Sequence, residues 1–306
     1  ADFAPAAAVM TPSSTPALKD PAAFKLMGQS KPRRDIPSKV DGSAIFALDI
    51  RRPHMVYAAV KRSPVFGGQL VSIDDKAARI IQGVIDVIKL PADEANGMVG
   101  QYSVSDSVAV VAESYWIAEQ GIGALELEWD TKGLESVSSN SIFKQFDRDI
   151  SSGKGRHLDD AAGDIKQIFS GAAKVLEAEY QVPYLAHTCM EPMNATAEVT
   201  DSKAEIWVGC QNPLGFRHVI ADALGIDADN VILHNCFMGG GFGRKSIADY
   251  ATQAALIAKA VGQPTQLIWS REEDIRQDFY RPAVKSHFRA AIDKHGNLLG
   301  WENTYV

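Results

Sequence analysis

The sequence predicts a mixed α/β (α+β) fold. Short runs that are continuously apolar or alternate apolar with polar residues, such as residues 108–112 and 125–129, are typical of strands. Residues 247–261 carry apolar side chains at helical spacing. Because strand and helix patterns interleave along the chain, we expect helices and strands to share the same units.

The composition describes an ordinary globular protein. The chain has 306 residues, of which 46% are hydrophobic and 23% are charged, and this length favours roughly two domains of ~150 residues. The net charge of −7 argues against a nucleic-acid-binding surface, which normally needs a basic patch. No apolar run approaches the ~18 residues of a membrane span, so none is expected.

Composition shifts divide the chain into four segments. Residues 1–34, rich in Ala, Pro, Ser and Thr, are predicted to be a linker. Residues 35–130 form a first α/β unit. Residues 131–172 are polar and predict an interdomain connection that carries one or two helices. Residues 173–306 form a second unit.

Local signals indicate where several elements begin and end. Residues 45–50 are predicted to be a strand. Asn212 is a good N-cap and Pro213 suits the first helical position, so a helix is expected from there to Gly225. Residues 287–306 read as two strands joined by a turn.

A glycine-rich loop is the best candidate for a binding site. It is expected between a strand and a helix, where glycines permit positive φ and bring bare backbone close to a ligand. Its N–H groups could receive an anion such as a phosphate or a metal-oxo group. The alternative is a tight turn without a ligand. The loop consists of Gly239, Gly240, Gly241, Phe242, Gly243 and Arg244.

Nucleotide-binding patterns are close to this loop but broken. Residues 239–246 nearly fit G-x-x-x-x-G-K-[ST], yet Arg244 stands where the second glycine should be and would obstruct a phosphate cradle. The dinucleotide fingerprint G-x-G-x-x-G also lacks its last glycine. A P-loop-like nucleotide binder therefore stays an alternative.

The three cysteines predict no metal site. Cys189, Cys210 and Cys236 show no C-x-x-C spacing, so we expect free thiols buried on strands. An iron–sulfur cluster held by this chain alone would usually need four thiolates.

Other polar residues are expected to have structural roles. His187 and Glu191 lie in a loop or strand, so their four-residue spacing does not place them on one helix face; we expect both to brace the domain core or its interface. Asp249 and Tyr250 are predicted to pack and cap the helix after the loop. Residues 272–274 are acidic and suit the N-terminus of a short helix.

Several motifs in fixed order resemble one family. Residues 238–243 resemble the molybdopterin-contacting loop of the xanthine dehydrogenase and aldehyde oxidase family, and residues 184–194 resemble the segment that opens its molybdenum domain. The segment Gln211-Asn212-Pro213, and then residues 269–274 and 278–282, match further family segments. The details are closest to the branch typified by the isoquinoline 1-oxidoreductase beta subunit, and the resemblance covers about residues 30–306.

The resemblance implies a fold and an activity. It implies a hammerhead-type α/β domain followed by the first part of a molybdopterin-binding domain. It implies a molybdenum–pterin cofactor, with iron–sulfur clusters on a small partner subunit. The family comprises hydroxylases and dehydrogenases that oxidise small molecules such as aldehydes or N-heteroaromatic compounds, with water as the oxygen source.

The resemblance also implies roles for residues of the loop. The backbone amides of Gly241, Phe242 and Gly243 would approach an oxygen ligand of the metal, and Gln211 would be a neutral hydrogen-bond donor near the cofactor. Arg244 would either stabilise the pterin phosphate or form a surface ion pair. No residue here is expected to ligate the metal directly.

One departure limits the implied activity. The family's catalytic base is a glutamate in a Gly-x-Gly-Glu segment near the end of the large subunit, and no such segment occurs here. We therefore assign no catalytic residue in this chain and expect the base beyond Val306, in a missing C-terminal half. The chain alone is expected to be inactive. A non-enzymatic docking paralogue is a further alternative, and the branch favours the periplasm over the cytoplasm.

Overall fold

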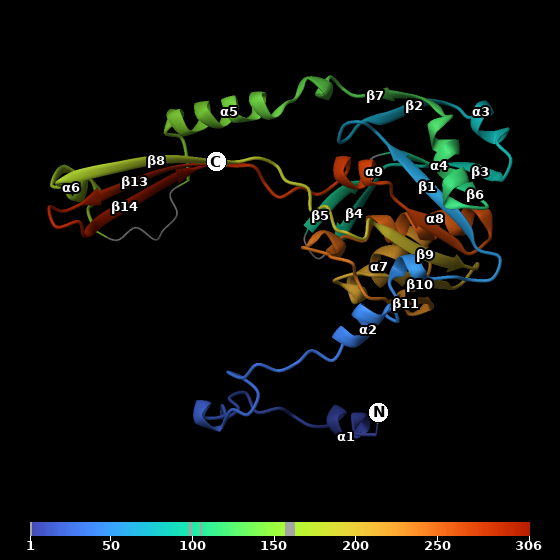
Figure 1. The fold of residues 1–306 in the computed structure, drawn as a ribbon, viewed down its shortest axis with the longest axis horizontal. Helices are drawn as coiled ribbons and strands as arrows, with labels where there is room; N and C mark the ends of the chain where they lie inside the picture. The colour runs from blue at the N-terminus through green and yellow to red at the C-terminus, as the bar shows by residue number, and fades with distance from the viewer. Residues whose placement is uncertain (1, 98–99, 105, 157–162) are drawn as a thin grey trace. The chain divides into compact units, whose positions relative to one another are not determined.

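The computed structural model describes residues 2–97, 100–104, 106–156 and 163–306 (Figure 1). It separates into two units, residues 1–44 and residues 45–306. The described part of the first unit contains α1 (Ala4–Ala8), the 3-10 turn η1 (Pro21–Ala23) and α2 (Ile36–Asp41), none of which buries a residue. Within the described residues, no helix combines the length and apolar content that a membrane crossing requires.

The second unit is built on a seven-stranded mixed sheet. β1 pairs in parallel with β12, with Val56 opposite Thr265, and pairs antiparallel with β6 on its other side. The sheet order is β11 (Val231–Asn235), β10 (Ala204–Val208), β9 (Asn194–Val199), β12 (Thr265–Ile268), β1 (Val56–Arg62), β6 (Ser107–Ala112) and β3 (Val84–Leu90).

This sheet runs across the predicted segments. β1, β3 and β6 come from residues 35–130, whereas β9 to β12 come from residues 173–306. The β1–β12 ladder joins the two groups by backbone hydrogen bonds. The sheet therefore contains strands from both predicted units. The division of the chain into the four predicted segments stays a prediction.

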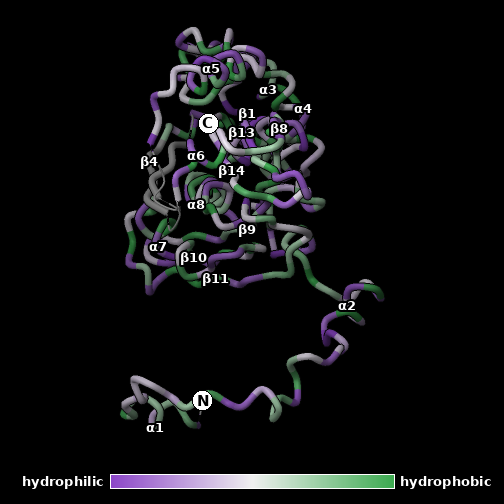
Figure 2. Tube along the Cα trace, turned by 90° about the vertical axis from the view of Figure 1, so that its left-hand side faces the viewer, coloured by the Kyte–Doolittle hydropathy of each residue, from purple (hydrophilic) through white to green (hydrophobic). Residues whose placement is uncertain are grey.

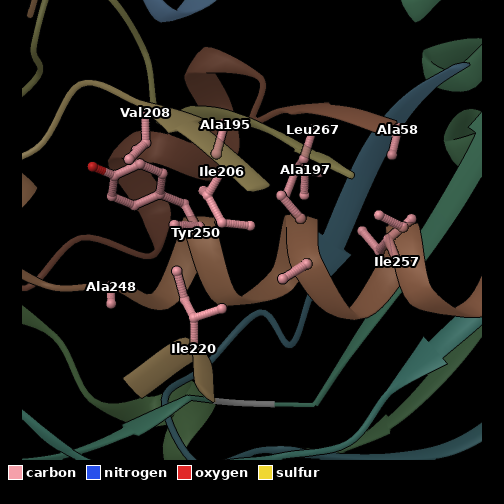
Figure 3. Close-up of a cluster of buried hydrophobic side chains, with 14 of the residues drawn as sticks. Ala58, Ala195, Ala197, Ile206, Val208, Ile220, Ala248, Tyr250, Ile257 and Leu267 are labelled. Carbon is pink, nitrogen blue, oxygen red and sulfur yellow. The ribbon is translucent and has the colours of Figure 1, made fainter. Parts of the chain in front are cut away.

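The core lies between the sheet and two helices. α8 (Asp249–Val261) packs against β9, β10 and β12, and α7 (Pro213–Leu224) packs against α8. Figure 2 shows α8 beside the strands β9 and β10. Figure 3 shows how the labelled sheet residues Ala195, Ile206 and Leu267 point toward α8, while Ile220 of α7 approaches α8 from another side.

Further elements complete the described part of the second unit. A separate three-stranded sheet has β13 in its centre, between β14 and β8. The remaining strands and helices are β14 (Leu298–Tyr305), β13 (Val284–Ile292), β8 (Lys174–Val182), β2 (Gln69–Asp74), β7 (Glu126–Asp130), β4 (Asp93–Gly97), β5 (Gly100–Val104), α3 (Lys76–Arg79), α4 (Tyr115–Gly123), α5 (Ser139–Ser152), α6 (Ile165–Ser170) and α9 (Arg271–Arg276).

The mixed α/β prediction is confirmed, and several element ends are confirmed with it. The side chain of Asn212 accepts a hydrogen bond from the N–H of Gly215, and α7 ends at Gly225 in the left-handed conformation. The polar connection carries α5 and α6, and the C-terminal strand pair forms as β13 and β14.

The strand predicted at residues 45–50 is wrong. Ala47–Asp49 form a 3-10 turn, η2. The carboxylate of Asp49 accepts a hydrogen bond from the N–H of Phe46 at 2.9 Å. Such a local bond between a side chain and the backbone competes with strand pairing. Phe46 makes only an isolated bridge to Phe237.

The cysteines are free thiols as predicted, but their placement on strands is wrong. Cys189 and Cys210 are buried and Cys236 is half-buried. All three lie in the connections that flank strands, because Cys210 and Cys236 follow β10 and β11 and Cys189 precedes β9. Burial raises the pKa of Cys210 to about 11, so this thiol is protonated at neutral pH.

Candidate functional site

The glycine loop follows β11 and turns sharply before α8. Gly240 and Gly243 have φ of +102° and +100°, and Phe242 between them has φ of +53°. A bulky residue at positive φ is strained and persists only where its surroundings hold it. Phe242 is 63% exposed while Gly241 beside it is buried, so the loop presents this ring, and not its whole backbone, at the surface of the unit.

Three successive amides of the loop are unused. Among the described residues, the N–H groups of Gly240, Gly241 and Phe242 have no acceptor. The amides on either side are occupied, because Gly239 donates to Glu191 Oε2 at 2.9 Å and Gly243 donates to Gln211 Oε1 at 3.0 Å. A short run of unpaired N–H groups is an arrangement that can receive an anion or an oxygen ligand.

The hydrogen bond of Gly243 changes which backbone amides are free to bind the cofactor. The resemblance implied that the amides of Gly241, Phe242 and Gly243 approach the metal's oxygen ligand. The amide of Gly243 is instead bound to Gln211. The free donors are therefore shifted by one residue, to Gly240, Gly241 and Phe242.

Gln211 lies directly beside the loop. Its backbone N–H donates to the carbonyl of Lys245 at 2.9 Å, and its Oε1 accepts from Gly243. A Cβ on Gly241 would stand only 2.7 Å from this Oε1, so the amide fills the space that a larger residue would need. Because Oε1 accepts, the Nε2 group remains as a neutral donor on an exposed side chain.

Arg244 is buried, so the predicted surface ion pair is wrong. Its guanidinium makes two hydrogen bonds to Asp249, at 3.0 and 2.8 Å, and its Nε lies 3.0 Å from Asp278 Oδ1. The side chain is 0% exposed. A buried cation is stable only when paired, and these two carboxylates hold the guanidinium in the core, where it braces the loop from inside.

The charge of Arg244 is stabilised by the same partners. Burial works against the charged form, but Asp249 and Asp278 outweigh it and raise the pKa of Arg244 above its ordinary value. The rings of Trp269 and Phe279 lie 5.4 and 5.0 Å from the guanidinium carbon. The alternative that Arg244 contacts a pterin phosphate has no support in this geometry.

His187 and Glu191 brace the core as expected. The backbone N–H of His187 donates to Asp278 Oδ2, and its Nδ1 lies 3.0 Å from the same carboxylate. Glu191 Oε2 accepts from Lys245 Nζ at 2.8 Å as well as from Gly239. Both residues therefore fix segments that flank the glycine loop.

Two smaller predictions are corrected in part. Tyr250 packs in the core and donates from its hydroxyl to the Gly209 carbonyl at 3.0 Å, as expected of a packing residue. Asp249 does not cap α8, because its carboxylate is bound to Arg244.

The acidic residues 272–274 were predicted to complement the dipole at the start of a short helix. Glu273 is also buried and lies 3.5 Å from Arg62 Nε, so it neutralises a cation in the core.

Sequence reasoning missed the residues that complete this core. Asp278 receives both Arg244 and His187. Arg62 of β1 lies over the ring of Trp269, 3.5 Å from its centroid. The only available signal was that Asp278 opens a family-like segment. No local pattern relates it to residue 187 or residue 244.

The P-loop alternative conflicts with the geometry. Lys245, which would have to reach a phosphate, is 1% exposed and bound to Glu191. The loop runs into a 3-10 turn, η5 (Arg244–Ser246), and α8 begins only at Asp249. A P-loop needs its lysine free and its helix immediately after the glycines.

Comparison with known proteins decides the family. A family model described as "Molybdopterin cofactor-binding domain" matches residues 150–306, just over half of the chain. The chain belongs to this family. The predicted resemblance is thereby confirmed.

Relatives with curated descriptions agree with this assignment. Isoquinoline 1-oxidoreductase subunit beta of Brevundimonas diminuta is 31% identical over 94% of this chain. The membrane-bound aldehyde dehydrogenase [pyrroloquinoline-quinone] of Gluconacetobacter polyoxogenes is 32% identical over 93% of it. This chain spans only 36% of the length of each relative.

A solved structure shows the same fold. Quinoline 2-oxidoreductase from Pseudomonas putida 86 superposes with a TM-score of 0.68 at 22% identity. The match covers 91% of this chain and 39% of that structure. The arrangement of helices and strands is thus shared with an enzyme much longer than this chain.

The residues of the loop fit the family's cofactor. A molybdenum–pterin group carries oxygen ligands and a phosphate, which accept hydrogen bonds. The loop offers three unpaired backbone N–H groups, and Gln211 adds an amide donor beside them. These donors are all neutral amides, and among the described residues no cluster of His, Cys, Asp or Glu is placed to hold a metal ion.

Proposed function

We propose that this chain forms one wall of the molybdenum–pterin site of an oxidoreductase, a hydroxylase or dehydrogenase. The proposed substrates are aldehydes or N-heteroaromatic compounds, with water as the oxygen source. The three unpaired amides at Gly240, Gly241 and Phe242 carry the proposal, and membership of the molybdopterin cofactor-binding family supports it. The names of the two relatives supply the substrate classes.

The roles proposed for this chain are binding and orientation. The bound molybdenum–pterin group supplies the two-electron oxidation chemistry. The amides of Gly240 to Phe242 and the Nε2 group of Gln211 hold oxygen atoms by neutral hydrogen bonds. Such fixed donors cost no reorganisation during a reaction and favour charge that develops on the oxygen atoms they face.

No residue of this chain is proposed as the catalytic base. Glu191 is the acidic residue nearest the loop amides in the hydrogen-bond network, but its carboxylate is bound to Lys245 and Gly239. We propose that the base lies on the remainder of a longer large subunit. Electrons would leave through iron–sulfur clusters on a small partner subunit, and a periplasmic location is favoured.

Molybdenum analysis tests this proposal. The protein expressed from the complete gene in molybdate-replete cells should contain stoichiometric molybdenum and should oxidise an aldehyde or an N-heterocycle. A metal-free preparation from such cells would count against the proposed function.

We further predict that the 306-residue chain alone retains no cofactor and turns over no substrate. Stoichiometric molybdenum together with activity in that chain would overturn this second prediction.

A further inference from the structure

One side chain joins both ends of the glycine loop. Glu191 Oε2 accepts from the N–H of Gly239, at the start of the loop, and from Lys245 Nζ, just after its end. The backbone of Glu191 adds a third bond, because its N–H donates to the Gly239 carbonyl at 3.0 Å. The five residues 240–244, which include the three unused amides, are therefore closed off at their base.

The two charged groups of this base are held inside the protein. The side chains of Glu191 and Lys245 are 6% and 1% exposed. The other carboxylate oxygen, Glu191 Oε1, accepts from the Leu48 N–H at 3.4 Å. Burial by itself would raise the pKa of Glu191, but the Gly239 amide and Lys245 outweigh it and lower the pKa, so the carboxylate is ionised at neutral pH.

Glycine at position 239 is part of the same contact. A Cβ there would collide with the Cβ of Glu191 and stand 3.2 Å from its backbone nitrogen. Because residue 239 has no side chain, the Glu191 N–H can reach the Gly239 carbonyl, and the Gly239 N–H can reach the Glu191 carboxylate. The contact between residues 191 and 239 therefore requires glycine at position 239.

The loop needs such a constraint. Phe242 lies at φ of +53° although it is exposed, so burial in the core does not hold this strained conformation. Three adjacent N–H groups also have no acceptor among the described residues. A loop free at one end would relax and turn these groups toward other partners, which makes its ends the place where the conformation is decided.

We propose that Glu191 and Lys245 form a positioning clasp, which holds the amides of Gly240, Gly241 and Phe242 in the orientation that binds an oxygen atom of the cofactor. This inference rests on the proposed function for the identity of the ligand. The clasp itself touches neither the cofactor nor the substrate. Its effect is to fix the donors before the ligand arrives.

The test removes both charges together in the protein expressed from the complete gene. Lys245→Met alone would leave the buried carboxylate of Glu191 without a cation, which is strongly destabilising, so this single variant is not used. The double variant E191Q/K245M keeps a side-chain oxygen that can accept from the Gly239 N–H, but it removes the ion pair between residues 191 and 245. A matched control, R52M/E198Q, removes an ion pair of 3.0 Å that does not touch the loop.

Hydrogen exchange provides the first readout. In E191Q/K245M the hydrogen-bonded amides of the loop, those of Gly239, Gly243 and Arg244, should exchange about ten-fold faster than in the wild type. Those of β9 should be unchanged, and R52M/E198Q should leave the loop at the wild-type rate. Unchanged exchange in the loop overturns the clasp, whether or not the wild type carries molybdenum. A metal-free wild type instead refutes the proposed function, so the two failures are distinguishable.

The split between kcat and KM provides the second readout. If the clasp orients the donors, folded and molybdenum-loaded E191Q/K245M should lose about ten-fold or more in kcat while KM changes little. The molybdenum electron paramagnetic resonance spectrum should also differ from that of the wild type. Wild-type kcat and spectrum in a variant with faster loop exchange would overturn the positioning role.

Discussion

At the scale of single residues, Gly239 illustrates how closely the loop base is packed. Gly239→Ala would drive a Cβ into Glu191, and because the obstacle includes backbone, the segment itself must move. We expect a loss of about 1–3 kcal/mol in the free energy of unfolding, the usual cost of overpacking. Urea unfolding followed by tryptophan fluorescence measures it.

The control for this prediction is a glycine with open space around it. A Cβ on Gly123, at the end of α4, would meet nothing within 4 Å. Gly123→Ala should therefore be neutral or stabilising by up to about 1 kcal/mol, because alanine favours the helix. If both variants lost the same free energy of unfolding, the close contact between Gly239 and Glu191 would not affect stability.

At the scale of elements, the start of α7 fixes Gln211. The side chain of Asn212 accepts from the Gly215 N–H at 3.1 Å and caps the helix immediately after Gln211. Asn212→Ala should cost about 1 kcal/mol of stability. It should also speed amide exchange at Gly243, because Gln211 Oε1 is then less firmly placed. Urea unfolding and hydrogen exchange measure the two effects.

A second cap separates these effects. Ser114 caps α4 by accepting from the Ile117 N–H at 3.3 Å, on a helix that does not adjoin the loop. Ser114→Ala should cost a similar amount of stability and leave exchange at Gly243 unchanged. If both variants changed Gly243 equally, the effect would be one of global stability and not of the α7 cap.

At the scale of the whole molecule, the matched domain depends on strands outside it. The family match begins at residue 150, but β12 lies beside β1, whose Ala58 and Val60 are fully buried in the core. A chain of residues 150–306 should therefore lack a cooperative thermal transition and bind a hydrophobic dye. Cooperative unfolding with a dispersed NMR spectrum would contradict this prediction.

The local features of this protein follow from its sequence. The N-cap at Asn212, the helix end at Gly225, the strand pair at the C-terminus and the loop of glycines are each specified by residues within a few positions of one another. Such signals act through backbone conformation and short hydrogen bonds, so they can be read before the fold is known. The resemblance implied that Gln211 lies near the cofactor, and the structure shows it beside the loop.

The candidate site itself was decided by the tertiary structure. Glu191 and Lys245 are 54 positions apart, and Arg62 and Glu273 are 211 apart. Arg244, predicted for a ligand or the surface, is buried because the fold brings Asp249 and Asp278 to it.

The physical reason is that a charged side chain is stable in the core only when an oppositely charged partner lies beside it. The order of strands in the sheet determines which partners meet. The sequence by itself determined the loop and the ends of its neighbouring elements. Only the tertiary structure decided which amides of that loop stay free and which side chains hold them so.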